Sequence, residues 1–148
     1  MTDRIERTIE LDAPVERVWR ALTDHREFGA WFLAAINGPF APGALSTGRM
    51  TYPGFEHMPW EARVEAIEPM HRFAFRWAPL YGDIDADTSA DPWTLVEFRL
   101  EPAGTRTRLT VVESGFDALP AERRPIAYEG NERGWAEQLG NIKAHVER

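Results

Sequence analysis

The chain has 148 residues, of which 43% are hydrophobic and 28% are charged, a composition typical of one folded domain rather than of a disordered segment. It contains no cysteine, which excludes a disulfide framework, a thiolate nucleophile and cysteine-ligated metals and favours a reducing compartment. The formal net charge is −7 and the arginines are scattered among acids, which argues against a nucleic-acid partner.

The first part of the chain predicts a strand followed by two helices. Residues 4–11 alternate between apolar and polar side chains, as in a half-buried strand. Asp12 and Pro14 then signal a helix start, and the next apolar residues recur at helical spacing. Asp24 can cap a second, short helix. The apolar face of that second helix would hold Phe28, Trp31 and Phe32.

The middle of the chain predicts an antiparallel meander. The Gly- and Pro-rich stretch 37–48 indicates turns around at most a short strand. Alternation then predicts strands near 47–53, 60–67, 72–78, 93–101 and 106–114. Pro102–Thr105 would form the hairpin turn between the last two strands.

The last segment predicts one long helix from about Ile126 to the C-terminus. Its apolar residues fall on one helical stripe: Tyr128, Trp135, Leu139, Ile142 and Val146. At about 1.5 Å per residue it would span roughly 30 Å, enough to cross a whole sheet. Gly134 and Gly140 interrupt it, either because close packing or a bend requires them or because the helix is simply weaker there. Residues 1–148 are thus predicted to form one α+β domain, with helices on one face of an antiparallel sheet.

Several short motifs follow one another in a distinctive order along almost the whole chain. They are residues 13–24 (APVERVWRALTD), Trp31-Phe32, Glu68-Pro69 before residues 73–77 (FAFRW), residues 104–110 (GTRTRLT), residues 113–116 (ESGF) and Gly134-Trp135. This order resembles the START-like (SRPBCC) superfamily of helix-grip proteins. Within it, the chain is similar to the family of the C-terminal domain of the activator of the ninety-kilodalton heat-shock protein ATPase.

The resemblance implies a helix-grip fold. A curved antiparallel sheet of about six or seven strands would wrap around the long C-terminal helix, with two short helices after the first strand and a cavity between sheet and helix. The resemblance implies no single chemistry, because members of the superfamily bind lipids, sterols, hormones and polyketides, and some catalyse cyclisation or hydration.

Large aromatic side chains are abundant, with six Trp, eight Phe and three Tyr, and such rings dominate both cores and ligand pockets. Strand and helix periodicity selects the side chains that would face the cavity. The candidate ligand-binding residues are Arg7, Phe32, Phe75, Trp77, Phe98, Val111, Glu113, Trp135, Gln138 and Leu139, with Asn131 on the flank of the helix stripe. For each ring, ordinary core packing is the alternative.

Arg7 and Glu113 both fall on inward-facing positions of their predicted strands. An unpaired buried charge is costly, so we expect an ion pair between them or a contact of each with a ligand. The alternative places Arg7 at the rim and Glu113 at a strand end in water.

No metal or cofactor site is predicted. The acidic stretch Asp83–Asp91 lacks the glycine and the final glutamate of a calcium loop, so it is expected to be a solvated loop. The four histidines show no metal-ligand spacing. Phosphate-binding loops, dinucleotide fingerprints and nucleophile elbows are also missing from the sequence.

Three functions remain open. The first is binding of an apolar or aromatic small molecule or lipid in the cavity. The second is an enzyme of the cyclase or hydratase type, with Glu113 as the leading acid or base and a raised Glu113 pKa as its mark. The third is a co-chaperone or interaction domain, which would show an exposed apolar patch around Trp31, Phe32 and Trp60. The N-terminus lacks a secretion signal and no apolar run approaches the roughly 20 residues of a membrane span, so a cytoplasmic protein is expected.

Overall fold

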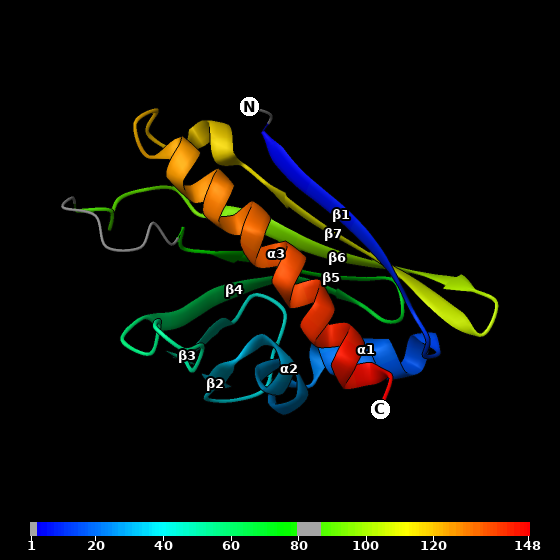
Figure 1. The fold of residues 1–148 in the computed structure, drawn as a ribbon. Coiled ribbons are helices and arrows are strands. Elements are labelled where there is room, and N and C mark those ends of the chain that lie inside the picture. The colour runs from blue at the N-terminus through cyan, green and yellow to red at the C-terminus, as the bar shows by residue number, and fades with distance from the viewer. Residues whose placement is uncertain (1–2, 80–86) are drawn as a thin grey trace.

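The computed structural model describes residues 3–79 and 87–148 and places them in one antiparallel sheet, two short helices and one long helix (Figure 1). This arrangement confirms the expected α+β helix-grip fold. The described elements, in chain order, are β1 (Arg4–Leu11), α1 (Val15–Thr23), α2 (His25–Phe32), β2 (Ala34–Ile36), β3 (Leu45–Met50), β4 (Pro59–Glu68), β5 (Arg72–Trp77), β6 (Thr94–Ala103), β7 (Arg106–Ser114), the 3-10 turn η1 (Phe116–Ala118) and α3 (Arg124–Val146).

The strands lie in the order β1-β7-β6-β5-β4-β3-β2, so the first strand is placed at one edge beside the last. The register pairs Ile5 with Glu113 and Arg7 with Val111, as expected for neighbouring first and last strands. The hairpin between β6 and β7 is tighter than the predicted four-residue turn, because Ala103 still pairs with Arg106. Gly104 makes this short turn possible with a φ of 67°.

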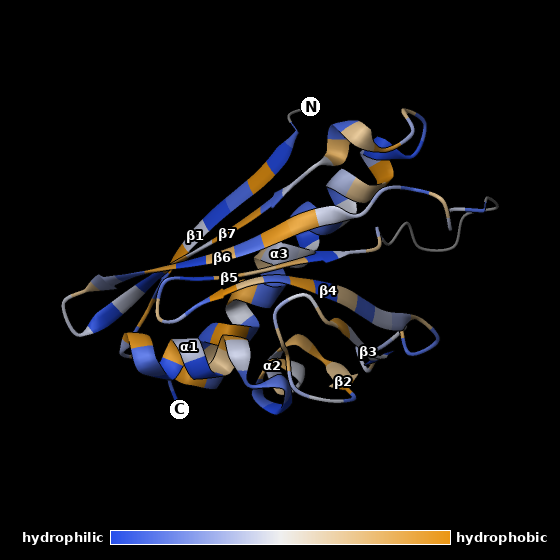
Figure 2. Cartoon of the chain, turned by 180° about the vertical axis from the view of Figure 1, so that it is seen from behind, coloured by the Kyte–Doolittle hydropathy of each residue, from blue (hydrophilic) through white to orange (hydrophobic). Residues whose placement is uncertain are grey.

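Helix α3 runs diagonally across one face of the sheet, and α1 and α2 lie near its C-terminal end (Figure 1). Along the strands seen from behind, hydrophilic and hydrophobic residues alternate (Figure 2). This is the pattern of a sheet that buries one face against helices and exposes the other. Helix α3 is continuous over 23 residues, so neither Gly134 nor Gly140 ends it.

The predicted cap of the second helix is confirmed, because the Asp24 carboxylate accepts hydrogen bonds from the backbone N–H groups of Arg26 (2.9 Å) and Glu27 (3.2 Å). Close packing explains Gly29 within this helix, since an added Cβ would lie 2.3 Å from the carbonyl oxygen of Ala34. The helix ends at Phe32, and Leu33 follows it as a left-handed cap with a φ of 70°. The chain then enters β2, a strand that the sequence did not predict.

The core between the sheet and α2 is made of closely packed rings. Phe28 stacks on Phe32 with ring centroids 5.0 Å apart, and it also contacts Trp60 and Phe98. Trp31 is buried among the same rings, and its indole N–H donates to the backbone oxygen of Ala21. Much of the interior that a cavity would occupy is therefore filled by side chains.

Part of the acidic loop is described by the structure, whereas residues 83–86 lie outside the described residues. The expectation of a purely solvated loop is wrong at its end, because Asp91 is buried and accepts two hydrogen bonds from Arg123, at 2.7 and 2.9 Å. This bidentate pair holds Asp91 against the chain just before α3.

Candidate functional site

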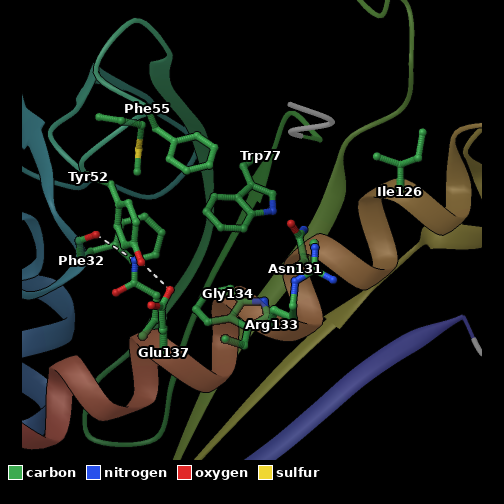
Figure 3. A pocket seen from close by; sticks show the side chains of 13 residues that line it. Phe32, Tyr52, Phe55, Trp77, Ile126, Asn131, Arg133, Gly134 and Glu137 are labelled. Carbon is green, nitrogen blue, oxygen red and sulfur yellow. Dashed lines mark hydrogen bonds between the residues drawn. The ribbon is translucent and has the colours of Figure 1, made fainter. Parts of the chain in front are cut away.

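A partly open pocket of about 400 Å³ lies between the N-terminal half of α3, the end of β5 and the loop that joins β3 to β4 (Figure 3). The residues that line it are Phe32, Met50, Tyr52, Phe55, Trp77, Ile126, Gly130, Asn131, Arg133, Gly134, Trp135, Glu137 and Gln138. Phe55 and Ile126 are about 40% exposed, and Figure 3 shows them on opposite sides of the pocket with Trp77 between them. The pocket therefore has an apolar rim as well as an aromatic wall.

The helix leaves room for this pocket because two of its lining positions have no side chain. Gly130 and Gly134 are one turn apart, and a Cβ added at either would meet no atom within 4 Å. The same holds for Gly140, which lies outside the pocket. Close packing is thus the wrong explanation for Gly134 and Gly140, and at Gly134 the missing side chain is part of the hollow.

Glu113 is completely buried and collects five hydrogen bonds from neutral side chains. Its carboxylate accepts from the indole N–H of Trp77 (2.8 Å), the hydroxyl of Thr94 (2.6 Å), the amide of Asn131 (2.9 Å to each oxygen) and the indole N–H of Trp135 (2.8 Å). Burial raises the pKa of Glu113, and these hydrogen bonds oppose that shift without reversing it. The alternative that placed Glu113 in water is wrong.

This carboxylate holds the wall of the pocket from behind. Three of its donors, Trp77, Asn131 and Trp135, line the pocket, whereas Glu113 itself does not. The Trp77 and Trp135 rings stack with centroids 5.6 Å apart and an interplanar angle of 25°. The indoles are therefore fixed both by stacking and by a shared acceptor. A raised pKa is the property expected of an acid or base, but in this arrangement the Asn131 and Trp side chains separate the carboxyl group from the pocket.

Arg7 has a different partner from the one expected. Its guanidinium pairs with Glu132 of α3 at 2.7 Å, and its Nε atom is buried without a hydrogen-bond partner among the described residues. Glu113, in turn, takes its hydrogen bonds from the neutral side chains named above. The hypothesis of an ion pair between Arg7 and Glu113 is therefore wrong, and Arg7 instead attaches β1 to the long helix.

The ten predicted ligand-binding residues fall into two groups. Four line the pocket: Phe32, Trp77, Trp135 and Gln138. Their contact with a ligand stays a prediction. The remaining six do not line it, since Phe75, Phe98, Val111 and Leu139 belong to the packed core, Glu113 lies behind the wall and Arg7 lies against Glu132. Ligand contact by these six stays a prediction as well, although neighbouring side chains fill the space beside Phe75, Phe98, Val111 and Leu139 that periodicity alone left open.

Sequence reasoning missed the loop side of the pocket and, on the helix, the lining residues Arg133 and Glu137. Tyr52 and Phe55 come from the β3–β4 loop, and their rings lie 5.7 Å apart. The Tyr52 hydroxyl donates to the carboxylate of Glu137, and this hydrogen bond raises the Tyr52 pKa. The Gln138 amide donates to the backbone oxygen of Phe32 at 2.8 Å. The loop and α2 are thus both attached to α3. The only sequence signal for the loop side was a pair of rings, Tyr52 and Phe55, three positions apart in a turn.

Other kinds of site find little support in the described part of the chain. No group of three or more His, Asp or Glu side chains there could hold a metal ion, and none of the described helices is long and apolar enough to cross a membrane. The prediction that an interaction domain would expose an apolar patch around Trp31, Phe32 and Trp60 is wrong. All three side chains are buried in the core.

Comparisons with known proteins agree with this fold. The family model described as "Activator of Hsp90 ATPase homolog 1-like protein" matches residues 12–147. No curated protein matches the sequence. Among solved structures, MLL2253 from Mesorhizobium loti is similar over 98% of this chain and 97% of its own, with 23% identity and a TM-score of 0.77. CalU16 from Micromonospora echinospora has 21% identity and a TM-score of 0.67, with 97% of this chain and 75% of that chain covered.

A third similar structure is DynU16, a protein in the dynemicin biosynthetic locus, with 24% identity and a TM-score of 0.76. The match covers 99% of this chain but only 48% of DynU16, so this chain spans about half of that protein's length. At these identities the solved structures show a shared fold.

Proposed function

The chain belongs to the family of activator of Hsp90 ATPase homolog 1-like proteins, and we propose that it binds an apolar or aromatic small molecule in the pocket beside α3. Membership of the family supports the fold but does not by itself identify an activity. The observation that carries the proposal is the pocket itself, a hollow of about 400 Å³ walled by rings and rimmed by exposed apolar side chains.

The size and lining of the pocket suit a small molecule. Ligand sites usually enclose about 300–1,000 Å³ and combine an apolar lining with a few polar groups. Here Phe32, Trp77 and Trp135 supply aromatic surface, and Asn131 and Gln138 supply polar groups. Aromatic faces favour flat or apolar partners, because stacking adds to the gain from burying apolar area.

The wall is also organised in advance of binding. The Glu113 carboxylate fixes the side chains of Trp77, Asn131 and Trp135, so a ligand would not have to order them. Ordering side chains on binding costs about 0.5–1.5 kcal/mol for each one. A preformed pocket of this kind supports binding as its role.

A second candidate is an enzyme acting on a hydrophobic substrate, favoured by the raised Glu113 pKa. For Glu113 to exchange a proton with a substrate, the Asn131 side chain would have to turn away and open a path from the pocket. DynU16 is a protein in a biosynthetic locus. That location is the only support it gives to a role of this fold in small-molecule metabolism. A co-chaperone role has no comparable support, since the rings expected to form its patch are buried.

The proposal is tested with N-phenyl-1-naphthylamine, a neutral aromatic fluorophore whose emission rises in apolar surroundings. The pocket-filling variant is Gly134→Leu, and the matched control is Gly140→Leu on the same helix outside the pocket. Leucine is a better helix former than glycine, and neither substitution meets an atom within 4 Å at Cβ, so both variants are expected to fold.

We expect the wild-type protein and Gly140→Leu to bind the fluorophore with the same affinity. Gly134→Leu should weaken binding by about tenfold or more, which corresponds to at least about 1.4 kcal/mol. Equal binding by all three proteins would place the fluorophore outside the pocket and refute the proposal. An absence of binding to the wild-type protein would refute it as well.

A further inference from the structure

Arg133 is the cation among the described residues that line the pocket. It lies on α3 and lines the hollow, yet no ion pair or hydrogen bond joins its side chain to any residue that the structure describes. Two acids near it on the helix have other contacts, since Glu137 accepts from the Tyr52 hydroxyl and Glu132 pairs with Arg7. Among the described residues, the Arg133 guanidinium is therefore not tied to a protein carboxylate and can reach a ligand beside the apolar wall.

Arg133 also supplies the charged hydrogen-bond donors among the described residues that line the pocket. The other lining side chains with N–H or O–H groups already donate to protein acceptors: Tyr52, Trp77, Asn131, Trp135 and Gln138. An arginine carries five N–H donors in a planar fork that matches the two oxygens of a carboxylate or sulfonate. A ligand with an anionic group would find its partner at this residue.

The positions of Glu137 and Arg133 also indicate how an anionic ligand would be oriented in the pocket. Figure 3 shows Glu137 below Tyr52 at one side of the pocket and Arg133 nearer to Asn131 at the other. The Glu137 carboxylate would repel an anionic group, whereas Arg133 would attract it. An anionic head placed at Arg133 leaves the apolar body of the ligand against Trp77 and the rings of the β3–β4 loop.

We propose that the ligand is an aromatic or apolar molecule that carries an anionic group, and that Arg133 binds this group at the mouth of the pocket. The inference rests on the proposed function and specifies its ligand class. Because the protein carries a formal charge of −7, its overall field disfavours anions, and selection of an anionic ligand depends on this local charge.

The test compares two fluorophores that differ by one charged group. 8-Anilinonaphthalene-1-sulfonate is N-phenyl-1-naphthylamine with a sulfonate added, so the pair isolates the anion. Both are titrated into the wild-type protein, Arg133→Gln and Lys143→Gln, at low and high salt. Lys143→Gln is the matched control, because it also removes one cation from α3. Lys143 lies outside the pocket, where it pairs with Glu147.

We expect Arg133→Gln to weaken binding of the sulfonate about fivefold to tenfold, the range between an exposed ion pair and a charge-assisted hydrogen bond. Its affinity for the neutral fluorophore should change less than about twofold. Lys143→Gln should leave both affinities unchanged. The difference in sulfonate affinity between the wild-type protein and Arg133→Gln should narrow at high salt, because salt screens the exposed guanidinium.

Two results would overturn the inference. If Arg133→Gln binds both fluorophores like the wild type, and Gly134→Leu still blocks them, the pocket binds ligands but Arg133 does not select anions. If Gly134→Leu still binds both fluorophores like the wild type, the fluorophores bind outside the pocket. The proposed function then fails together with the inference. The Gly134→Leu variant therefore separates the two failures.

Discussion

Replacing Glu113 by glutamine tests the carboxylate behind the pocket wall. Gln keeps the shape of the side chain but exchanges one acceptor oxygen for a donor amide. If the amide takes the place of Oε2, it can donate to Thr94, but it then faces the indole N–H of Trp77, which can only donate. If it takes the place of Oε1, it faces the indole of Trp135. Either orientation of Glu113→Gln leaves one indole without an acceptor.

The expected cost follows from that unpaired group. A buried donor left without an acceptor costs about 1–3 kcal/mol. Because Trp77 is only partly buried and can turn toward the pocket, whereas Trp135 is buried, we expect Glu113→Gln to release Trp77 and to lower the free energy of unfolding by about 1–2 kcal/mol in acid. Release of Trp77 should also weaken binding of N-phenyl-1-naphthylamine, since this ring forms part of the pocket wall.

The pH dependence of this cost has a definite sign. Burial raises the Glu113 pKa above its ordinary value of 4.5, so the folded protein binds this proton more tightly than the unfolded chain does. The stabilisation is complete below pH 4.5 and is lost as the pH rises through the raised pKa. Glu113→Gln lacks this titration. The deficit of the variant relative to the wild type should therefore be largest in acid and shrink as the pH rises.

Glu97→Gln is the matched control, because the contribution of the Glu97 carboxylate to stability should depend on pH with the opposite sign. Burial acts to raise the pKa of Glu97, but the hydrogen bonds and charges of Arg72 and Arg99 more than reverse this effect and lower it below 4.5. Glu97 therefore stabilises the fold above pH 4.5, and this contribution is lost as the pH falls through its lowered pKa. The deficit of Glu97→Gln should shrink in acid.

The assay is urea unfolding followed by tryptophan fluorescence between about pH 2 and pH 8, with each variant compared to the wild type at the same pH. Subtracting the free energy of unfolding of the wild type from that of the variant cancels the pH-dependent contributions of the acidic groups that both proteins share. A Glu113→Gln deficit that grows with pH, or a variant as stable as the wild type throughout, would show that Glu113 is not the buried, high-pKa anchor described above.

Two further predictions concern the helices. Asp24→Ala removes the cap of α2, so the free energy of unfolding should fall by about 1 kcal/mol in urea melts; unchanged stability would mean that the cap contributes nothing. Gly134→Ala and Gly140→Ala should each raise the free energy of unfolding by up to about 1 kcal/mol, because alanine favours the helix and its Cβ meets no atom within 4 Å. A loss of stability in either alanine variant would show that the helix needs glycine there.

Much of the fold followed from two periodicities in the sequence. Alternation located β1 and the strands from β4 to β7, and the helical stripe located α3, because each pattern reports which face of an element is buried. The three residues of β2 are too few to show alternation, so this strand was missed. Strand ends moved by a few residues where a turn was tighter than expected, as at Gly104.

The site was harder to predict than the fold. Periodicity showed that Phe75, Phe98 and Trp135 point inward, but it could not show that the first two would be packed by other rings while the third borders a hollow. That difference depends on how side chains fill space. Glu113 was recognised as inward-facing, yet its donors lie 18–36 residues away in the sequence. Arg133 lies outside the apolar stripe of α3 and gave no signal.

A crystal structure of the protein with N-phenyl-1-naphthylamine tests the central claim most directly. The account predicts the fluorophore between Tyr52, Trp77 and Gly134, with Glu113 still bonded to the two indoles behind it. A fluorophore found elsewhere on the molecule, with the hollow beside α3 closed by protein side chains, would contradict it.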